Sequence, residues 1–442
     1  MNDTIAAIST APGTGGVAII RISGDKSLEI TKRLFVPMGK TPVENFVPYM
    51  LYVGDIKTSE FSDNGMCVYF KAPKSFTGED VVEIHCHGGI AISHGILNAI
   101  FELGARPATN GEFTKRAFLN GKLSLSSCEG LIDMINSESV SQIKSGYYLF
   151  KEKLKDKIVS VQQMLMDVLA QIDANIDYPE EDLIEDDGIV IKEKLQAIYP
   201  ILNELVNSYD SGKIVSDGVK VALIGETNTG KSSLLNALTG EQRAIVTDVA
   251  GTTRDVVEGS LILGGIKFTL YDTAGIRETE DKVEKIGIER SNALIKSANL
   301  ILHVIDSSKT VNNEVLKDLY DKKVITVYNK SDLKKIDAIN GASINISCST
   351  GENLDKLKSM LYEVGAGGIN TDGEYITQKR HFYALKDAKE SLQTAIQRIG
   401  LTPLDLVACD IKDCWSKLGE ITGSTASEDI INEIFSRFCV GK

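Results

Sequence analysis

One stretch of the sequence has the residue types and the spacing to hold the phosphates of a nucleotide. The run GETNTGKS begins at Gly225, fits the pattern GxxxxGK[ST], follows a strand-like VKVALI and precedes a helix-like KSSLLNALTG. Backbone N–H groups of such a loop surround phosphate oxygens at a helix N-terminus, Lys231 reaches the β- and γ-phosphates, and Ser232 offers an oxygen to Mg²⁺. The loop residues expected to bind nucleotide are Asn228, Thr229, Gly230, Lys231, Ser232 and Ser233.

Two further segments follow in the order that a GTPase requires. In AGTTRD, Thr252 or Thr253 stands where a mobile switch adds an oxygen to Mg²⁺ and senses the γ-phosphate, and we assign the Mg²⁺ contact to Thr253. Asp272 ends the strand-like IKFTLY, so its carboxylate can reach the Mg²⁺ shell, and the N–H of Gly275 can reach the γ-phosphate. This nucleotide-binding segment comprises Asp272, Thr273, Ala274 and Gly275.

Two more segments select the base. The Asp332 carboxylate in NKSD can accept hydrogen bonds from both N1–H and the exocyclic amine of guanine, a donor pair that adenine lacks. In the SCS that ends the last strand, Cys348 stands where Ala is usual and Ser349 where a Lys or Arg would pack over the base, which predicts a low nucleotide affinity. Guanine binding is therefore predicted and an ATPase is disfavoured. The base-binding residues are Asn329, Lys330, Asp332, Ser347 and Cys348.

These motifs require a sheet with its functional groups at one edge. From Gly218, apolar runs alternate with amphipathic segments, which predicts a mostly parallel sheet with crossover helices. Earlier residues form short apolar runs bounded by Gly and Pro, typical of an α+β domain, and two other stretches have helical periodicity. We predict a multidomain α+β and α/β protein: an N-terminal domain (1–120), a helical domain (121–215 and 373–442) and an inserted α/β domain (216–372).

The composition indicates the number of domains and excludes some classes of protein. The chain has 442 residues, which predicts about three domains, and 48 basic against 61 acidic residues give a net charge of −13. Such a charge argues against broad nucleic-acid affinity, so any RNA contact must be local. Seven cysteines without a CxxC pair, no basic leader and no long apolar run predict a cytoplasmic protein that does not enter membranes.

The residues alone do not indicate which groups catalyse GTP hydrolysis. Ile276 follows DTAG, where Ras-type proteins place a glutamine that orients the attacking water, and isoleucine cannot hydrogen-bond water. The positive charge that the transition state needs could come from Arg254 or Arg277 in the switches, or from a bound cation.

Several longer motifs resemble one family across the whole chain. They are STAPGTGGVAIIRISG, SFTGEDVVEIHCHGG, GEFTKRAFLNGKLSL, TDVAGTTRDVVEG and the terminal FCVGK, together with a helical arm that holds the inserted GTPase. They resemble the MnmE (TrmE) family of tRNA wobble-uridine modification GTPases. The resemblance implies a tetrahydrofolate-binding and dimerising N-terminal domain, a discontinuous helical domain and a Ras-like P-loop GTPase domain.

The resemblance also implies where the missing charge comes from. In this family K⁺ lies beside the phosphates, and the matching ligands here are Asn228, Thr247, Val249 through its carbonyl, and Thr252; Thr247 and Thr252 also count among the GTP-binding residues. Glu284, which the residues alone would place on an exposed helix, matches the family residue that orients the attacking water. Hydrolysis then takes place with two GTPase domains facing each other in a homodimer.

A one-carbon site is implied in the same way. Arg21, Glu83 and Lys122 match positions that bind 5-formyl-tetrahydrofolate, with Lys442 contributing. Cys439, which the residues alone would make a buried small hydrophobic side chain, matches a catalytic thiol of tRNA modification.

The implied function is a K⁺-stimulated, Mg²⁺-dependent GTPase in a heterotetrameric complex with the FAD-dependent MnmG (GidA) partner. That complex adds an aminomethyl or carboxymethylaminomethyl group to C5 of the wobble uridine of certain tRNAs, with 5,10-methylene-tetrahydrofolate or a related folate as carbon source. The alternative is a regulatory or assembly GTPase whose folate-like domain only dimerises. Such a switch needs neither the Arg21, Glu83 and Lys122 set nor CVGK, so folate binding discriminates between the two.

Overall fold

The computed structural model describes residues 3–177, 187–240, 257–272, 293–309, 322–336, 341–371 and 373–442. The chain forms two compact units. The first unit comprises Met1–Ile132, Leu149–Ile198 and Glu390–Lys442, and the second comprises Asp133–Tyr148 and Tyr199–Lys389. The domain boundaries at 120, 215 and 372 stay a prediction.

The first unit contains a seven-stranded sheet in the order β3-β4-β5-β6-β2-β1-β7, antiparallel except for the β1–β7 pair. Alternate residues of β2, Ala18, Ile20 and Ile22, face a core that α1 and α2 cover. The other face of the sheet therefore carries the intervening residues. The elements are β1 (Ile5–Ile8), β2 (Val17–Ser23), α1 (Ser27–Leu34), β3 (Phe35–Pro37), β4 (Leu51–Lys57), β5 (Ser62–Phe70), β6 (Val81–His87), α2 (Ile90–Glu102) and β7 (Arg106–Pro107).

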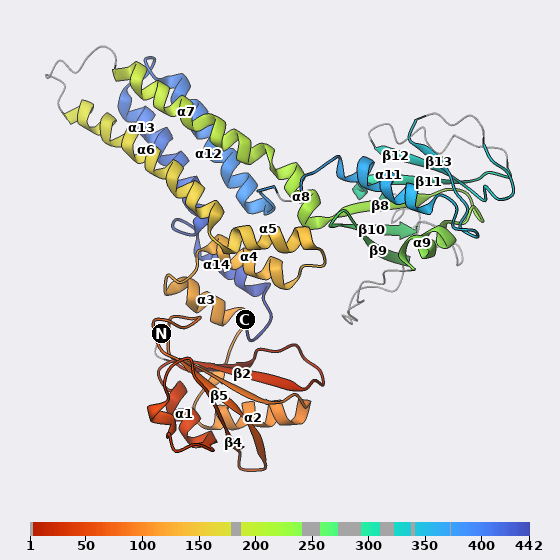
Figure 1. Ribbon diagram of the computed structural model, residues 1–442. Helices are drawn as coiled ribbons and strands as arrows, with labels where there is room; N and C mark the ends of the chain where they lie inside the picture. Colours follow the sequence, from red (N-terminus) through yellow and green to blue (C-terminus); the bar gives the residue numbers. More distant parts are fainter. Residues whose placement is uncertain are drawn as a thin grey trace, which may run out of the picture. The chain divides into compact units, whose positions relative to one another are not determined.

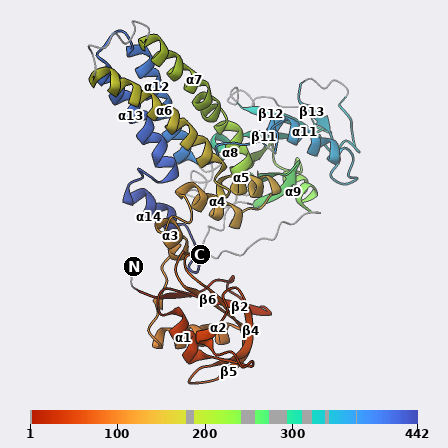
Figure 2. The same cartoon turned by 60° about the vertical axis from the view of Figure 1, so that its left-hand side comes forward.

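Helices make up the rest of the first unit. In α6 the buried residues recur every three or four positions, and α6 packs along α13 (Figures 1 and 2), where the Gln162 side chain donates to the Trp415 carbonyl at 3.0 Å. No helix in the described parts of the chain is long and apolar enough to cross a membrane. The helices are α3 (Glu112–Leu119), α4 (Leu125–Ile135), α5 (Val140–Phe150), α6 (Lys153–Asp177), α7 (Asp187–Asn207), α12 (Lys379–Arg398), α13 (Leu404–Thr422) and α14 (Glu428–Ser436). Four of them, α4, α5, α7 and α12, have residues in both units.

The second unit contains a six-stranded sheet in the order β13-β12-β11-β8-β10-β9, parallel except for β9. Apolar residues of α9 and α11 share one core with this sheet. The predicted parallel sheet and the α+β and helical classes are confirmed, and all parallel strands end at one edge. The elements are α8 (Tyr209–Asp217), β8 (Val219–Ile224), α9 (Lys231–Thr239), β9 (Val257–Leu263), β10 (Ile266–Asp272), β11 (Leu300–Asp306), β12 (Lys323–Asn329), β13 (Ser343–Asn345) and α11 (Leu354–Ala366).

Candidate functional site

The predicted phosphate-binding loop joins β8 to α9 at the carboxyl edge of the second sheet (Figure 1). Its backbone enters the left-handed region at Asn228 (φ 63°) and at Gly230 (φ 92°), directly before α9 begins. The Lys231 side chain is buried, and its Nζ donates to the carbonyls of Gly225 at 2.9 Å and Glu226 at 2.7 Å. The ammonium group therefore lies inside the loop that would surround the phosphates.

The two predicted residues of the Mg²⁺ shell in the described part of the chain meet directly. Ser232, at the start of α9, donates from Oγ to Oδ2 of Asp272 at 2.7 Å. Asp272 is buried at the end of β10, which pairs with β8, so the strand pairing brings its carboxylate beside the loop. A hydroxyl and a carboxylate are oxygen donors of the kind that Mg²⁺ prefers, so this pair fits the ion. Ser233 lies next in α9 and is exposed.

The two predicted base-binding motifs are joined by a short hydrogen bond. Ser347 Oγ donates to Oδ1 of Asp332 at 2.6 Å and lies 2.9 Å from Ser349 Oγ. The hydrogen bond from Ser347 lowers the pKa of Asp332 below its usual value. The carboxylate is thus charged at neutral pH, which is the form that accepts hydrogen bonds from guanine.

Asn329 ties the phosphate-binding loop to the base-binding motifs. Its Nδ2 donates to the Thr229 carbonyl at 2.9 Å, and its Oδ1 accepts from the backbone N–H of Cys348 at 3.3 Å. A Cβ at Gly230 would lie 2.3 Å from Asn329 Nδ2, so this approach requires glycine. One buried amide therefore sets the spacing of three motifs that are far apart in the sequence.

Asp306, which none of the sequence motifs indicates, ends β11 at the same edge. Lys330 Nζ contacts Oδ2 of Asp306 at 2.6 Å and donates to the Asn228 carbonyl at 3.0 Å. Burial disfavours the charged form of Asp306, but hydrogen bonds from Lys330 and Ser308 outweigh it and lower the pKa to about 2. The signal in the sequence was an acidic residue at the end of the otherwise uncharged strand LILHVID.

Several predicted residues lie outside the described residues. They are Thr247, Val249, Thr252, Thr253, Thr273, Ala274, Gly275 and Glu284, together with the alternative charge donors Arg254 and Arg277.

The first unit brings together two of the residues that the resemblance assigned to folate. Arg21 on β2 and Glu83 on β6 are directly opposite in the antiparallel register and form an ion pair at 2.8 Å. The Arg21 guanidinium lies over the rings of Phe76 and Phe113, 5.3 and 5.7 Å from their centroids. Burial disfavours a charged Glu83, but the neighbouring His85, 3.5 Å away, and Arg21 lower its pKa. This site therefore presents a charged pair beside two aromatic rings.

The two lysines of the folate set lie elsewhere on the first unit. Lys122 follows α3 and is exposed, and its Nζ donates to the Pro73 carbonyl at 3.0 Å. Lys442 is half-buried. Within the described residues, no hydrogen bond or ion pair joins either lysine to Arg21 or Glu83.

Cys439 lies three residues after the end of α14 and is exposed. The prediction of a buried thiol, which the residues alone favoured, is therefore wrong. The backbone attaches this turn to the loop before α3. The Gly111 N–H donates to the Cys439 carbonyl at 3.4 Å, and Asn110 pairs with Val440 in an antiparallel bridge. The sequence gave no indication of this contact, because its partners lie more than 300 residues apart.

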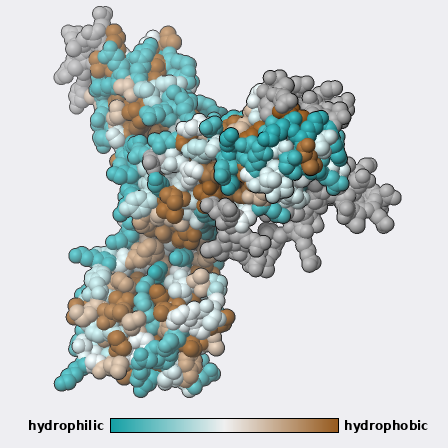
Figure 3. Space-filling model, turned by 45° about the vertical axis from the view of Figure 1, so that its right-hand side comes forward, coloured by the Kyte–Doolittle hydropathy of each residue, from teal (hydrophilic) through white to brown (hydrophobic). Residues whose placement is uncertain are grey.

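The sheet face that carries Arg21 and Glu83 continues into exposed apolar side chains. Strand alternation and register place Leu51 and Val53 of β4 on this face, along with Val17 of β2. Each of the three is about half exposed, at 49, 49 and 53%. Figure 3 shows apolar surface on the part of the molecule that this sheet forms. An apolar sheet face in contact with water is typical of an interaction surface.

Comparisons with known proteins agree along the whole chain. The model of the MnmE helical domain matches residues 125–439, and the model of the GTP-binding protein TrmE N-terminus matches residues 4–122. The tRNA modification GTPase MnmE of Natranaerobius thermophilus is 43% identical, and that of Acetivibrio thermocellus is 42% identical; each match covers 100% of this chain and 99% of the relative. A crystal structure of Aquifex aeolicus Era bound to GDP and AlF4⁻ is 28% identical over 39% of this chain and 66% of that chain, with a TM-score of 0.27.

Proposed function

This chain belongs to the MnmE family of tRNA modification GTPases, and from that premise we propose the cation, the folate and the partners with which it works. It is a GTP hydrolase that takes part in tRNA modification. The observation that carries the proposal is the edge of the second sheet, where Lys231, the Ser232–Asp272 pair and the Ser347–Asp332 pair gather. These groups suit phosphate, Mg²⁺ and guanine in turn.

In the proposed mechanism K⁺ supplies the positive charge that Ras-type proteins obtain from an arginine. Its ligands are Asn228 and the switch oxygens of Thr247, Val249 and Thr252, while Ser232 and Thr253 bind Mg²⁺. Asn228 supports this assignment because it is exposed in the loop and its side chain forms no hydrogen bond to the described residues. Glu284 orients the attacking water in place of the missing glutamine.

The cation is tested by steady-state GTP hydrolysis in K⁺ and in Na⁺ at equal ionic strength. We expect stimulation by K⁺ of about tenfold or more, since a preorganised charge at the phosphates stabilises the transition state. Asn228→Ala should lose the stimulation, and Thr227→Ala, an exposed neighbour in the same loop, should keep it. Equal rates in both salts would transfer the role to Arg254, Arg277 or a partner.

The water-orienting role is tested by Glu284→Gln, which keeps the size of the side chain and removes its charge. Hydrolysis should be lost while GTP binding stays at the wild-type level, because the role is confined to the chemical step. A turnover near that of the wild type would contradict the assignment.

The proposed carbon donor is a 5-formyl- or 5,10-methylene-tetrahydrofolate bound at Arg21, Glu83, Lys122 and Lys442. The charged Arg21–Glu83 pair beside Phe76 supports it, because a carboxylate can accept from the pterin and an aromatic ring can stack on it. Calorimetry with 5-formyl-tetrahydrofolate should give binding that Glu83→Ala weakens. Absence of binding by the wild type would favour the regulatory switch instead.

The proposed partners are a second copy of the chain, tRNA, and the FAD-dependent MnmG (GidA) protein in a heterotetrameric complex in the cytoplasm. The exposed apolar face with Leu51 and Val53 supports a homodimer through the first sheet. Val53→Glu should give a monomer in light scattering, and a dimer of unchanged stability would contradict this surface.

Cys439→Ser should fail to restore wobble-uridine modification in a null strain while GTP hydrolysis continues.

A further inference from the structure

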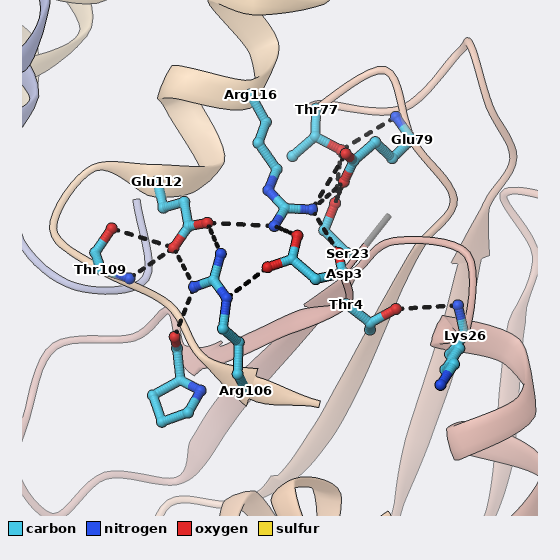
Figure 4. A network of polar contacts seen from close by, with 11 residues as sticks. Asp3, Thr4, Ser23, Lys26, Thr77, Glu79, Arg106, Thr109, Glu112 and Arg116 are labelled. Carbon is cyan, nitrogen blue, oxygen red and sulfur yellow. Dashed lines mark hydrogen bonds and ion pairs between the residues drawn. The ribbon is translucent and has the colours of Figure 1, made fainter. Parts of the chain in front are cut away.

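A network of ion pairs around one buried arginine lies at the base of α3, shown in Figure 4. The Arg116 side chain is 1% exposed. Its guanidinium contacts Glu79 Oε2 at 2.9 Å, Asp3 Oδ1 at 2.8 Å and Glu112 Oε1 at 3.2 Å. These three carboxylates come from the start of the chain, from the loop before β6 and from α3 itself.

A second arginine completes the network. Arg106 on β7 donates from Nε to Asp3 Oδ2 at 2.6 Å and from Nη1 to Glu112 Oε2 at 2.9 Å. Asp3 and Arg106 are nearly half exposed, whereas Arg116 is fully buried. Ion pairs of a buried charge add little net stability compared with a well-packed apolar core, but loss of one partner is costly. The groups that the network holds in place therefore matter more than its contribution to stability.

Glu112 holds the loop that precedes α3. Its Oε2 accepts from both the backbone N–H of Thr109 at 2.8 Å and the Thr109 hydroxyl at 3.1 Å (Figure 4). The next two residues, Asn110 and Gly111, are those that bind the backbone of the terminal turn at Cys439 and Val440. A series of contacts thus runs from Arg106 and the buried Arg116 to the turn that carries the exposed thiol.

The terminal turn depends on this loop for its position. Gly111 has φ 65°, and a Cβ there would lie 2.7 Å from the Phe435 carbonyl, so the loop and the end of α14 are in close contact. The side chains of Cys439 and Lys442 form no hydrogen bond to the described residues. The turn that carries them is held by its backbone contacts to this loop, by the buried ring of Phe438 and by the close approach of Gly441 to the Ile8 carbonyl.

The same network reaches the Arg21–Glu83 pair. Phe113, whose ring lies under Arg21, stands between Glu112 and Arg116 in α3. On the other side, Ser23, two residues beyond Arg21 in β2, donates to Glu79 Oε2 at 2.8 Å. Displacement of the network would therefore move both the pair and the terminal turn.

We propose that Arg106, Glu112 and Arg116 are positioning residues of the one-carbon site, which fix the Cys439–Lys442 turn and the Arg21–Glu83 pair in one arrangement. They touch neither ligand nor reacting atoms and act through the Thr109–Gly111 loop and Phe113. This inference rests on the proposed folate site for its function, but the geometry that it describes can be measured without any folate.

The test uses the full chain with a nitroxide on Cys439, after Cys348→Ser and Cys409→Ser have removed the two other thiols that are not buried. Glu112→Gln keeps the shape and removes the charge. A matched control is Ile56→Val, a substitution in the buried core of the same sheet. We expect an immobile nitroxide spectrum in the parent and in Ile56→Val, and a mobile one in Glu112→Gln. An immobile spectrum in all three would overturn the proposal.

Gly111→Ala provides a second route that leaves every charge in place. The added methyl group would clash with the Phe435 carbonyl, so the nitroxide should again become mobile. If Glu112→Gln does not fold, this variant decides the question. Equal mobility in Gly111→Ala and the parent would overturn the role of the loop.

Binding of 5-formyl-tetrahydrofolate to the unlabelled proteins tests whether folate binding depends on the network, which is the functional half of the proposal. Glu112→Gln should bind about tenfold more weakly, because displacement of supporting groups by about 1 Å is costly to a site, whereas Ile56→Val should bind as the wild type does. Wild-type affinity in Glu112→Gln would overturn the functional half. If the wild type itself does not bind, the proposed folate function fails, and the nitroxide spectra still decide whether the network positions the turn.

Discussion

The nucleotide site of the second unit and the charge network of the first unit both position polar groups at the edge of a sheet, and both join residues about 100 positions apart in the sequence, but they use different elements to do so. In the nucleotide site each motif is a short continuous stretch at the end of a strand, and the contact of Lys330 with Asn228 joins two such stretches over 102 residues. In the network, Arg116 lies 113 residues from Asp3, and the loop that it supports meets the opposite end of the chain.

The difference follows from the two topologies. In a parallel sheet every strand ends at the same edge, so each motif needs only to follow its own strand to reach the site. In the mostly antiparallel sheet of the first unit, neighbouring strands run in opposite directions, and the site is assembled across strands and helices by side-chain contacts. A single substitution should therefore affect ligand affinity in the second unit and stability in the first.

Arg116→Met should produce the largest effect. Removal of this buried charge leaves the Glu79 carboxylate without an arginine partner, and Asp3 and Glu112 with Arg106 alone, which costs about 3–5 kcal/mol of the free energy of unfolding. Denaturant unfolding followed by the fluorescence of Trp415, the one tryptophan of the sequence and part of the same unit, measures it. Arg33→Met, at an exposed ion pair, should change this free energy by less than about 1 kcal/mol. Equal effects would refute the distinction between the two arginines.

Acid should weaken the first unit through Glu112. Hydrogen bonds from Arg106 and the Thr109 N–H outweigh burial and lower the pKa of Glu112 from 4.5 to about 2. A lowered carboxyl pKa stabilises the fold above pH 4.5, and this stabilisation is lost as the pH falls toward 2, a change of about 3 kcal/mol. Unfolding of the wild type and of Glu112→Gln between pH 5 and 2 should show a smaller loss in the variant. Parallel curves would exclude Glu112 as the titrating group.

Asp332→Asn should weaken GTP binding about a hundredfold, because an amide cannot accept from both donors of guanine. Xanthosine triphosphate, which presents an acceptor where guanine has its amine, should bind the variant better than GTP does. The stability of the protein should stay close to that of the wild type, since the carboxylate is at the surface of the site. Competition against a fluorescent guanine nucleotide measures both affinities, and unchanged preference for GTP would remove Asp332 from base recognition.

The smallest effect is expected at Asn228, whose φ of 63° is unfavourable for residues with a Cβ. Asn228→Gly should be more stable than Asn228→Ala by about 1 kcal/mol, since only glycine adopts this region without strain. Thermal unfolding without nucleotide measures the difference. Equal stabilities would indicate that the loop relaxes, and the local geometry would then not constrain the proposed cation ligand.

Much of the second unit could be predicted from the sequence because its signals are local. The alternation of strands and helices predicted the parallel sheet, and the family resemblance predicted the fold class, both of which are confirmed. The assigned site residues of the switches lie outside the described residues and stay predictions. The motifs did not indicate which contacts hold them together. These contacts are made by Asn329 and Asp306.

The sequence by itself determined the family, the classes of the domains and the chemistry of each motif, because strand periodicity, loop glycines and residue types act over a few positions. Only the tertiary structure decided that Cys439 is exposed, that its turn rests on Asn110 and Gly111, and that Arg116 lies buried behind them. The physical reason is that these contacts join positions hundreds of residues apart, and no local pattern records which distant backbone groups will meet once the sheet and helices have packed.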